Sequence, residues 1–400
     1  MARVKIIIIT LWVFIISGYS MSFFSSANQG IGMRQFITTV RGMGMGDAGI
    51  TLPDRFALNG YNIASWRHAD WTQVSLLMHY DRNSIDFGED NFQTSTSNFS
   101  GVHFSVPIKK HQWVFGISVL PYTLVDFSYK KRIDAQEITY FKNVFLKGSI
   151  SRVQANLAWS PHPRLGLGIS YHYYYGNIED RVEWIFDHPD YYDSSSKIEY
   201  RFGGPAAGFS LEYMLLDSLY LGGFLDLKPN LNFTEVTTDL ITREEQEFSS
   251  EATLPLSFGL GGNYYLNSRW NFAASVAFQK WSEGFSLSEL EEENLEDWYR
   301  MGVGIEHVHA PGGKRSFWNK IDIRAGFSMG NIGYKYNQQS VKEYSGHLGL
   351  GVPFFGDQAR FDFALIAGIR GDRSQTLAQE KFFHFVLSIS AGELWFQKFR

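Results

Sequence analysis

The residues of this chain that come closest to a chemical motif are three glycines near its N-terminus. Gly44, Gly46 and Gly49 have the spacing of a dinucleotide-binding fingerprint, in which glycines let a pyrophosphate approach the backbone. That fingerprint binds a nucleotide only within a βαβ unit that is followed by an acidic residue. No such pattern surrounds these glycines. We therefore interpret them as positions where two backbones pack closely, because glycine has no Cβ.

Two histidines offer a second chemical pattern. His307 and His309 share one face of a strand-like stretch beside a Pro-Gly-Gly sequence at 311–313. Two imidazoles are too few ligands for a zinc site, so we interpret them as a pair at the membrane interface. We predict no metal ion and no other cofactor. The chain also lacks a nucleophile-elbow pattern and a local cluster of Ser, His and Asn, so we do not expect an enzyme.

The elements that carry these residues are strands, as the alternation over residues 253–279 indicates. Its apolar members are Leu254, Leu256, Phe258, Leu260 and Tyr264, followed by Phe272, Ala274, Val276 and Phe278. Successive side chains of a strand point to opposite faces, so each strand has one apolar face. The alternation lasts about ten residues, the length that a tilted strand needs to cross a bilayer. This pattern predicts a membrane β-barrel whose apolar face contacts lipid.

Charged residues in the strand-like stretches fall on the other face. They are Asp226, Asp322, Arg324, Asp362 and Arg370. An Arg or Lys on the lipid face near the midplane would cost about 2–4 kcal/mol. We therefore expect these side chains to line the lumen, where opposite charges can pair.

Composition and the N-terminus agree with an exported barrel. Mean hydropathy is -0.19, which excludes a bundle of transmembrane helices, and the net charge of -5 gives no reason to expect nucleic acid. The apolar run at 6–16 follows Arg3 and Lys5 and precedes small residues, so residues 1–20 read as a signal peptide with cleavage as late as residue 27. Without cysteine, the chain has neither disulfides nor a lipoprotein anchor.

Short and long connections alternate between the strand-like stretches, as in barrels with short periplasmic turns and long extracellular loops. The long polar segments that we predict as loops are 81–96, 132–145, 177–197, 232–251, 282–296, 331–341 and 371–379. The stretches between them predict an all-β fold: a transmembrane antiparallel β-barrel of about 14 strands over residues 71–400.

A family resemblance adds to this reading. Residues 41–50, Arg-Gly-Met-Gly-Met-Gly-Asp-Ala-Gly-Ile, resemble the Gly-rich "GMGGAG" run of FadL-like outer-membrane proteins, and Asn62-Ile63-Ala64 resembles their "NPA" motif without its proline. The ending at 392–396 is similar too. The resemblance implies a hatch or plug over residues 28–70 inside the barrel. Its implied ligand or hatch residues are Arg41, Gly44, Gly46, Asp47, Gly49, Asn62 and Ala64.

The resemblance also implies inward movement of hydrophobic compounds through a lateral opening at a kinked strand. Pro121 lies in the middle of the strand-like stretch 114–130, and proline cannot donate to a strand ladder. We expect the opening near Pro121 and Tyr122, with Asp126 facing the gap. The alternative is that Pro121 marks the point where the strand leaves the membrane.

These observations predict a protein of the cell outer membrane that takes up fatty-acid-like or aromatic compounds. Its expected partners are outer-membrane lipid, the hydrophobic ligand and, during biogenesis, the barrel assembly machinery. The same fold resemblance covers PorV-like proteins, so the alternative is a scaffold or shuttle that binds exported proteins.

Overall fold

The structure is a computed structural model that describes residues 22–26, 31–88, 90–135, 138–187, 190–239, 244–282, 294–309, 320–354 and 358–393. The expected signal peptide at 1–20 and the aromatic ending at 394–396 lie outside these residues. Within the described part, no helix is long and apolar enough to cross a membrane.

Nearly all of the regular structure is one antiparallel sheet. Its strands are β1 (Met33–Arg34), β2 (Thr72–Phe87), β3 (Asp90–Lys109), β4 (Trp113–Ala135), β5 (Ile138–His162), β6 (Leu165–Phe186), β7 (Ser194–Leu216), β8 (Leu219–Asp226), β9 (Asn230–Asp239), β10 (Glu245–Thr253), β11 (Ser257–Tyr265), β12 (Trp270–Gln279), β13 (Trp298–His307), β14 (Asp322–Tyr336), β15 (Gln339–Phe354), β16 (Ala359–Arg370) and β17 (Ala378–Glu393). The helices are short: η2 (Phe23–Ser26), α1 (Val40–Met43), η3 (Ile63–His68) and α2 (Arg373–Thr376).

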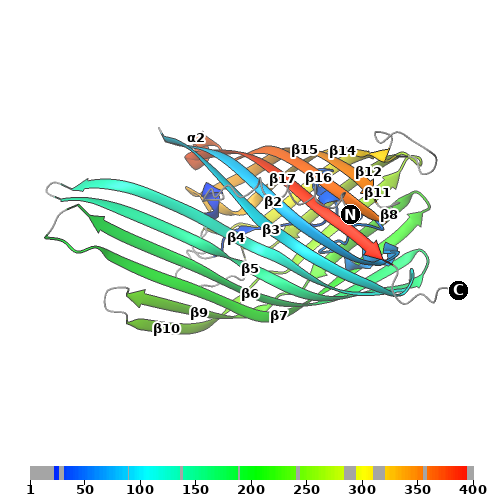
Figure 1. Ribbon diagram of the computed structural model, residues 1–400, viewed down its shortest axis with the longest axis horizontal. Coiled ribbons are helices and arrows are strands. Elements are labelled where there is room, and N and C mark those ends of the chain that lie inside the picture. The colour runs from blue at the N-terminus through cyan, green and yellow to red at the C-terminus, as the bar shows by residue number, and fades with distance from the viewer. Residues whose placement is uncertain are drawn as a thin grey trace, which may run out of the picture.

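The sheet closes into a barrel, because the last strand, β17, pairs along its whole length with β2 (Figure 1). β8 and β9 both pair with β7 and continue one another across residues 227–229. β10 and β11 continue one another across residues 254–256 in the same way. When each of these pairs is counted once, the described strands β2 to β17 form a closed barrel of fourteen, which confirms the predicted fold.

The apolar face of the sheet points outward, as predicted. Leu260 and Leu348 are each 60% exposed, whereas the residues on either side of each leucine along its strand are small or polar. One residue differs from the expectation. Leu254 is fully buried, because the strand is interrupted at 254–256 and the alternation does not continue across the break.

Several segments that the sequence predicts as loops are strands. β4 to β7 continue through most of 132–145 and 177–197, and Figure 1 shows them projecting far beyond the rest of the barrel. β5 has 25 residues, about 80 Å at roughly 3.3 Å per residue, against about 30 Å for the hydrocarbon core. Outside the membrane a strand needs no apolar face, so its sequence looks like that of a polar loop.

Residues 31–70 lie inside the ring of strands. Their side chains are almost all buried, and their contacts are with the inner faces of strands from β4 to β17. The lumen is therefore filled by the chain's own N-terminal segment, which we call the inner segment.

Candidate functional site

The glycine run of the inner segment lies directly against glycines of the wall, by which we mean the barrel strands β2 to β17. A Cβ at Gly44 would be 2.9 Å from the Cα of Gly349 on β15. Gly46 has φ +71° and faces the backbone of β13 and β14, where a Cβ would collide with the carbonyl groups of Val303 and Phe327. Two backbones meet here without intervening side chains, as the absence of Cβ atoms permits. The glycines at 44 and 46 thus serve close packing.

Asp47 and Gly49 complete this run. Asp47 adopts a left-handed conformation with φ +60°, and its carboxylate accepts a hydrogen bond from Arg300 of β13 at 2.6 Å. Gly49 packs against the side chain of Thr38, so it holds the inner segment against itself and not against the wall.

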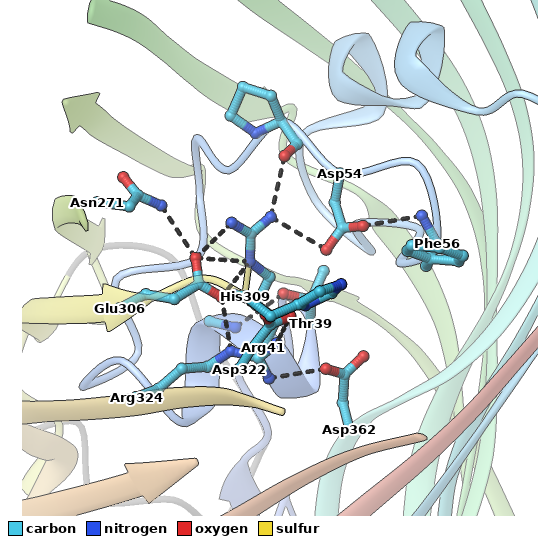
Figure 2. A network of polar contacts seen from close by, with 12 residues as sticks. Thr39, Arg41, Asp54, Phe56, Asn271, Glu306, His309, Asp322, Arg324 and Asp362 are labelled. Carbon is cyan, nitrogen blue, oxygen red and sulfur yellow. Dashed lines mark hydrogen bonds and ion pairs between the residues drawn. The ribbon is translucent and has the colours of Figure 1, made fainter. Parts of the chain in front are cut away.

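Arg41 lies at the centre of a buried polar network (Figure 2). Its guanidinium donates to Glu306 of β13 at 2.5 Å, to Asp54 at 3.1 Å and to the carbonyl of Pro53 at 2.9 Å. The side chain is buried, so its charge is balanced by these two carboxylates and not by water. The contact joins α1, the loop at 53–54 and the wall.

The network continues along the wall. Glu306 also accepts from Arg324 at 2.8 Å, and Arg324 donates to Asp362 at 2.7 Å. Arg360 closes the circuit, because it donates to Asp362 at 2.8 Å and to Asp54 at 2.5 Å. Three arginines and three carboxylates therefore alternate, each ion touching two of the opposite charge.

Both ions of the inner segment stay charged in this network. Burial alone would raise the pKa of the Asp54 carboxyl, but attraction to Arg360 and Arg41 outweighs burial and holds that pKa below its usual range. Burial would lower the pKa of Arg41, but Glu306 and Asp54 raise it well above its usual value. The pairing therefore persists across physiological pH.

The other residues of the family-like motif are anchored by hydrogen bonds. The amide of Asn62 donates to the carbonyl of Ile50 at 3.0 Å, which joins two parts of the inner segment that are 12 residues apart. The backbone N–H of Ala64 donates to Ser210 of β7 at 3.0 Å. Asn62 and Ala64 thus position the segment and do not line the cavity described below.

The wall has an unpaired edge between β3 and β4. In the described residues, the β3–β4 ladder runs from Lys109 and Trp113 at the turn to Val102 and Val119, and the two strands do not pair beyond that point. Both strands are bulged at this point, β3 at Ser100 and β4 at Tyr122, and bulges end or bend strand pairing. Beyond it, β3 pairs with β2 and β4 pairs with β5, so the facing edges lose their mutual partners.

The inner segment covers this edge. Its two-residue strand β1 pairs with Thr123 and Leu124 of β4, and the N–H of Gln35 donates to the carbonyl of Tyr122 at 2.9 Å. Pro121 lies next to the bulge, in the same strand. Asp126 lies further along β4, beside an open pocket of about 510 Å³ that Lys147 and Arg181 also line.

Arg34 of β1 is a site residue that sequence reasoning missed. Its guanidinium carbon lies 4.0 Å from the ring centre of Tyr122, and none of its three nitrogens has a hydrogen-bond partner among the described residues. It lines a cavity of about 60 Å³ between the inner segment and the wall. No local motif marks Arg34, because the aromatic rings around it come from distant parts of the chain.

The two histidines considered above contact different groups. His307 packs against Trp270, with ring centres 4.8 Å apart. His309 contacts Asp322 at 2.7 Å and belongs to the margin of the Arg41 network (Figure 2). Glu306, on the opposite face of the same strand, contacts Arg41 of the inner segment.

Comparisons with known proteins agree with this fold. A family model described as BamG matches residues 1–400. No curated protein matches the chain. Among solved structures, a FadL homologue of Pseudomonas aeruginosa is similar with a TM-score of 0.64 and 13% identity, over 90% of this chain and 99% of that one.

Two further structures have the same architecture. The CymD monoaromatic hydrocarbon channel has a TM-score of 0.56 and 13% identity, over 90% of this chain and 98% of its own. The Pseudomonas putida toluene transporter TodX has a TM-score of 0.54 and 13% identity, over 84% and 93%. The fold is therefore that of FadL-like outer-membrane barrels.

Proposed function

The chain belongs to the BamG family, and from that premise and its FadL-like fold we propose that it takes up hydrophobic small molecules across the outer membrane. The ligand class is fatty-acid-like or aromatic. The ligand binds in the lumen, and the hatch, expected over residues 28–70, includes the inner segment. Passage occurs beside the hatch, through a lateral opening between β3 and β4.

The unpaired edge of β4 is the observation that carries this proposal. The ladder stops in the middle of the wall, and in the described residues the short strand β1 pairs with the edge of β4 beyond it. A few backbone hydrogen bonds hold β1 in place, whereas neighbouring wall strands pair along most of their length. Displacement of β1 would expose a path between the lumen and the lipid without breaking the barrel.

The names of the structural relatives support the ligand class. TodX is described as a toluene transporter and CymD as a monoaromatic hydrocarbon channel. The small cavity beside Arg34 does not hold such a ligand in this conformation, so uptake requires the hatch to move.

A disulfide lock tests the proposal. Because the chain has no native cysteine, the two introduced cysteines can pair only with each other. Met33 and Leu124 are paired across β1 and β4, so Met33→Cys with Leu124→Cys fixes the hatch to the edge. We expect oxidation to abolish uptake of toluene or a fatty acid into proteoliposomes and reduction to restore it. The matched control, Leu348→Cys with Leu365→Cys, joins two paired wall strands and leaves uptake unchanged. Equal uptake by the oxidised and reduced lock would reject the lateral route.

A second candidate function is that of a scaffold beside the barrel assembly machinery. The family name BamG is consistent with such a relation. The projecting strands β4 to β7 and β9 to β10, with the connection between β6 and β7, also offer exposed aromatic side chains, among them Tyr129, Tyr192 and Phe248. Isolation of the barrel from envelopes separates the two functions. Stoichiometric recovery of the central assembly barrel supports the scaffold, and lipid or hydrocarbon bound without protein supports uptake.

A further inference from the structure

Three potential metal ligands meet on the inner face of the barrel where its first and last strands join. His79 and Asp81 lie two residues apart on β2, so both side chains point into the lumen. His384 of β17 is directly opposite Asp81 in the ladder, and Val386 is opposite His79. The three residues therefore form a compact triangle across the seam between β2 and β17. Figure 1 shows these two strands side by side where the barrel closes.

The ligand atoms of this triangle converge. Nε2 of His79 lies 2.9 Å from Oδ1 of Asp81, and Nε2 of His384 lies 3.3 Å from the same oxygen. All three atoms lie within 4.8 Å of one another. Ligands of a tetrahedral metal with bonds of about 2.0–2.2 Å are separated by roughly 3.4 Å, so only small shifts are needed to admit an ion.

The contacts within the triangle are poor hydrogen bonds. Although His79 Nε2 and Asp81 Oδ1 are close, neither atom has a hydrogen bond of acceptable geometry among the described residues. Both side chains are nearly buried, with His79 10% and Asp81 4% exposed. Buried polar atoms usually have a well-aligned partner, so the arrangement fits atoms that point toward a common centre better than toward one another.

The surrounding charges permit a cation. Arg300 and Arg370 line the same cavity as His79 and His384. Arg300 is paired with Asp47 and Glu343, and Arg370 with Glu343 and Glu380. Carboxylates engage both of these guanidinium groups. Arg34 lines the same cavity without a carboxylate partner among the described residues, and its guanidinium lies over the ring of Tyr122, 4.0 Å from the ring centre. The cavity of about 60 Å³ that both histidines line has room for water beside them.

We propose that His79, Asp81 and His384 form a binding site for a divalent transition-metal ion such as Zn²⁺, with water from the cavity in the remaining position. Two imidazoles and one carboxylate suit zinc and its neighbours in the first transition series, whereas Ca²⁺ and Mg²⁺ prefer oxygen ligands alone. The ion joins β2 to β17, so it fastens the seam of the barrel. The sequence alone predicts no metal site, because His384 is remote from the other two ligands.

Metal titration of the purified full-length protein tests the site. We expect one equivalent of Zn²⁺ per barrel by calorimetry, and a visible absorption band of low-symmetry Co²⁺ when Co²⁺ replaces Zn²⁺. His79→Gln and His384→Gln should each lower the affinity at least about tenfold and remove the Co²⁺ band. Zn²⁺ should raise the unfolding temperature of the unmodified protein but not that of either variant.

A lumenal histidine away from carboxylates gives the matched control. His103 on β3 is buried and contacts the hydroxyl of Ser118, so His103→Gln should bind Zn²⁺ like the unmodified protein. Heat-dependent gel mobility reports whether each variant has folded. The proposal is overturned if the unmodified protein takes up no stoichiometric metal, or if both triangle variants bind it with unchanged affinity. The triangle would then be an ion pair between histidine and aspartate.

Discussion

At the scale of single residues, Glu306 joins the inner segment to the wall. It accepts hydrogen bonds from Arg41 of the inner segment, from Arg324 of β14 and from Asn271 of β12. The carboxylate is buried, so no water replaces it when it is removed. Such ion pairs contribute less to stability than to a unique position, because desolvation offsets much of their attraction.

Neutralising Glu306 should therefore be costly. Glu306→Gln leaves two buried arginines short of one negative charge, which we expect to lower the free energy of unfolding by about 3–5 kcal/mol. Chemical unfolding in lipid vesicles measures this loss. Glu247→Gln, at an exposed position on β10, is the control and should change stability by less than about 0.5 kcal/mol. Equal effects of the two substitutions would show that the network does not fasten the inner segment.

The lowered pKa of Asp54 predicts how its contribution depends on pH. The carboxyl of the unfolded chain titrates near pH 4 and that of the folded protein lower. The stabilisation is thus fully present above about pH 4 and is lost as pH falls through the folded pKa. We expect the stability difference between the unmodified protein and Asp54→Asn to be constant from pH 8 to 5 and to shrink below pH 4. A difference that vanishes between pH 7 and 5 would contradict the assigned pairing.

At the scale of elements, the inner segment touches the wall through two kinds of contact. Glycines 44 and 46 pack on the backbones of β13 to β15, and β1 pairs with the free edge of β4. The first contact has no side chains to adjust, so it fixes the distance between segment and wall. The second is a short ladder, which is easier to break and re-form.

The glycine contact predicts a strong effect of one added methyl group. Gly46→Ala meets two carbonyl groups of the wall and adopts a left-handed φ, so we expect displacement of the inner segment and faster proteolysis within it. Gly88→Ala is the control, since Gly88 also has a positive φ (+61°) but nothing within 4 Å of an added Cβ. Backbone strain should lower the free energy of unfolding of each variant by roughly 1–2 kcal/mol. The collision with the wall should lower that of Gly46→Ala by about 1–3 kcal/mol more. Equal loss in both would mean that packing is unimportant here.

The bulge in β4 predicts an effect on transport. Pro121→Ala restores a backbone donor next to the bulge, which favours a more regular strand and a narrower opening. We expect slower uptake of hydrophobic compounds into proteoliposomes. Pro107→Ala is the matched control, because Pro107 also lies at a register shift but within the paired part of β3. Unchanged flux of every compound tried with Pro121→Ala would remove the proposed opening.

At the scale of the whole molecule, the barrel is strongly asymmetric. The strands β4 to β7 are the longest, and Figure 1 shows that they project beyond the opposite wall, where β12 and β13 are short. A barrel that only spans the membrane needs strands of about 9–11 residues. The projecting part of the sheet therefore extends beyond the hydrocarbon core of the bilayer.

Truncation of this sheet separates the two proposed functions. Replacing residues 130–143 with Asn-Gly joins Tyr129 to its ladder partner Val144 by a tight turn. We expect the barrel to assemble and to keep its heat-dependent gel mobility, because the strand pairs inside the membrane are unaltered. Retained uptake with loss of a bound protein would assign the projecting sheet to the scaffold function, and the reverse result would assign it to ligand entry.

Much of this molecule was predictable from its sequence. The alternation around Phe272 and Leu260 determined the outward face, and Asp362 and Arg324 lie in the lumen as their place in the pattern predicts. These properties are local, since the direction of each side chain follows from its position along one strand. The count of fourteen strands also followed, because turns separate them in the sequence.

Only the tertiary structure decided which distant residues meet. Arg41 pairs with Glu306, and β1 pairs with the open edge of β4. His384 lies beside His79 and Asp81 because β17, the last strand, pairs with β2. The extent of the projecting strands was hidden as well, since strands in water need not alternate. Ring closure and register set these contacts between residues up to 300 or so positions apart, and no local pattern encodes a partner at that distance.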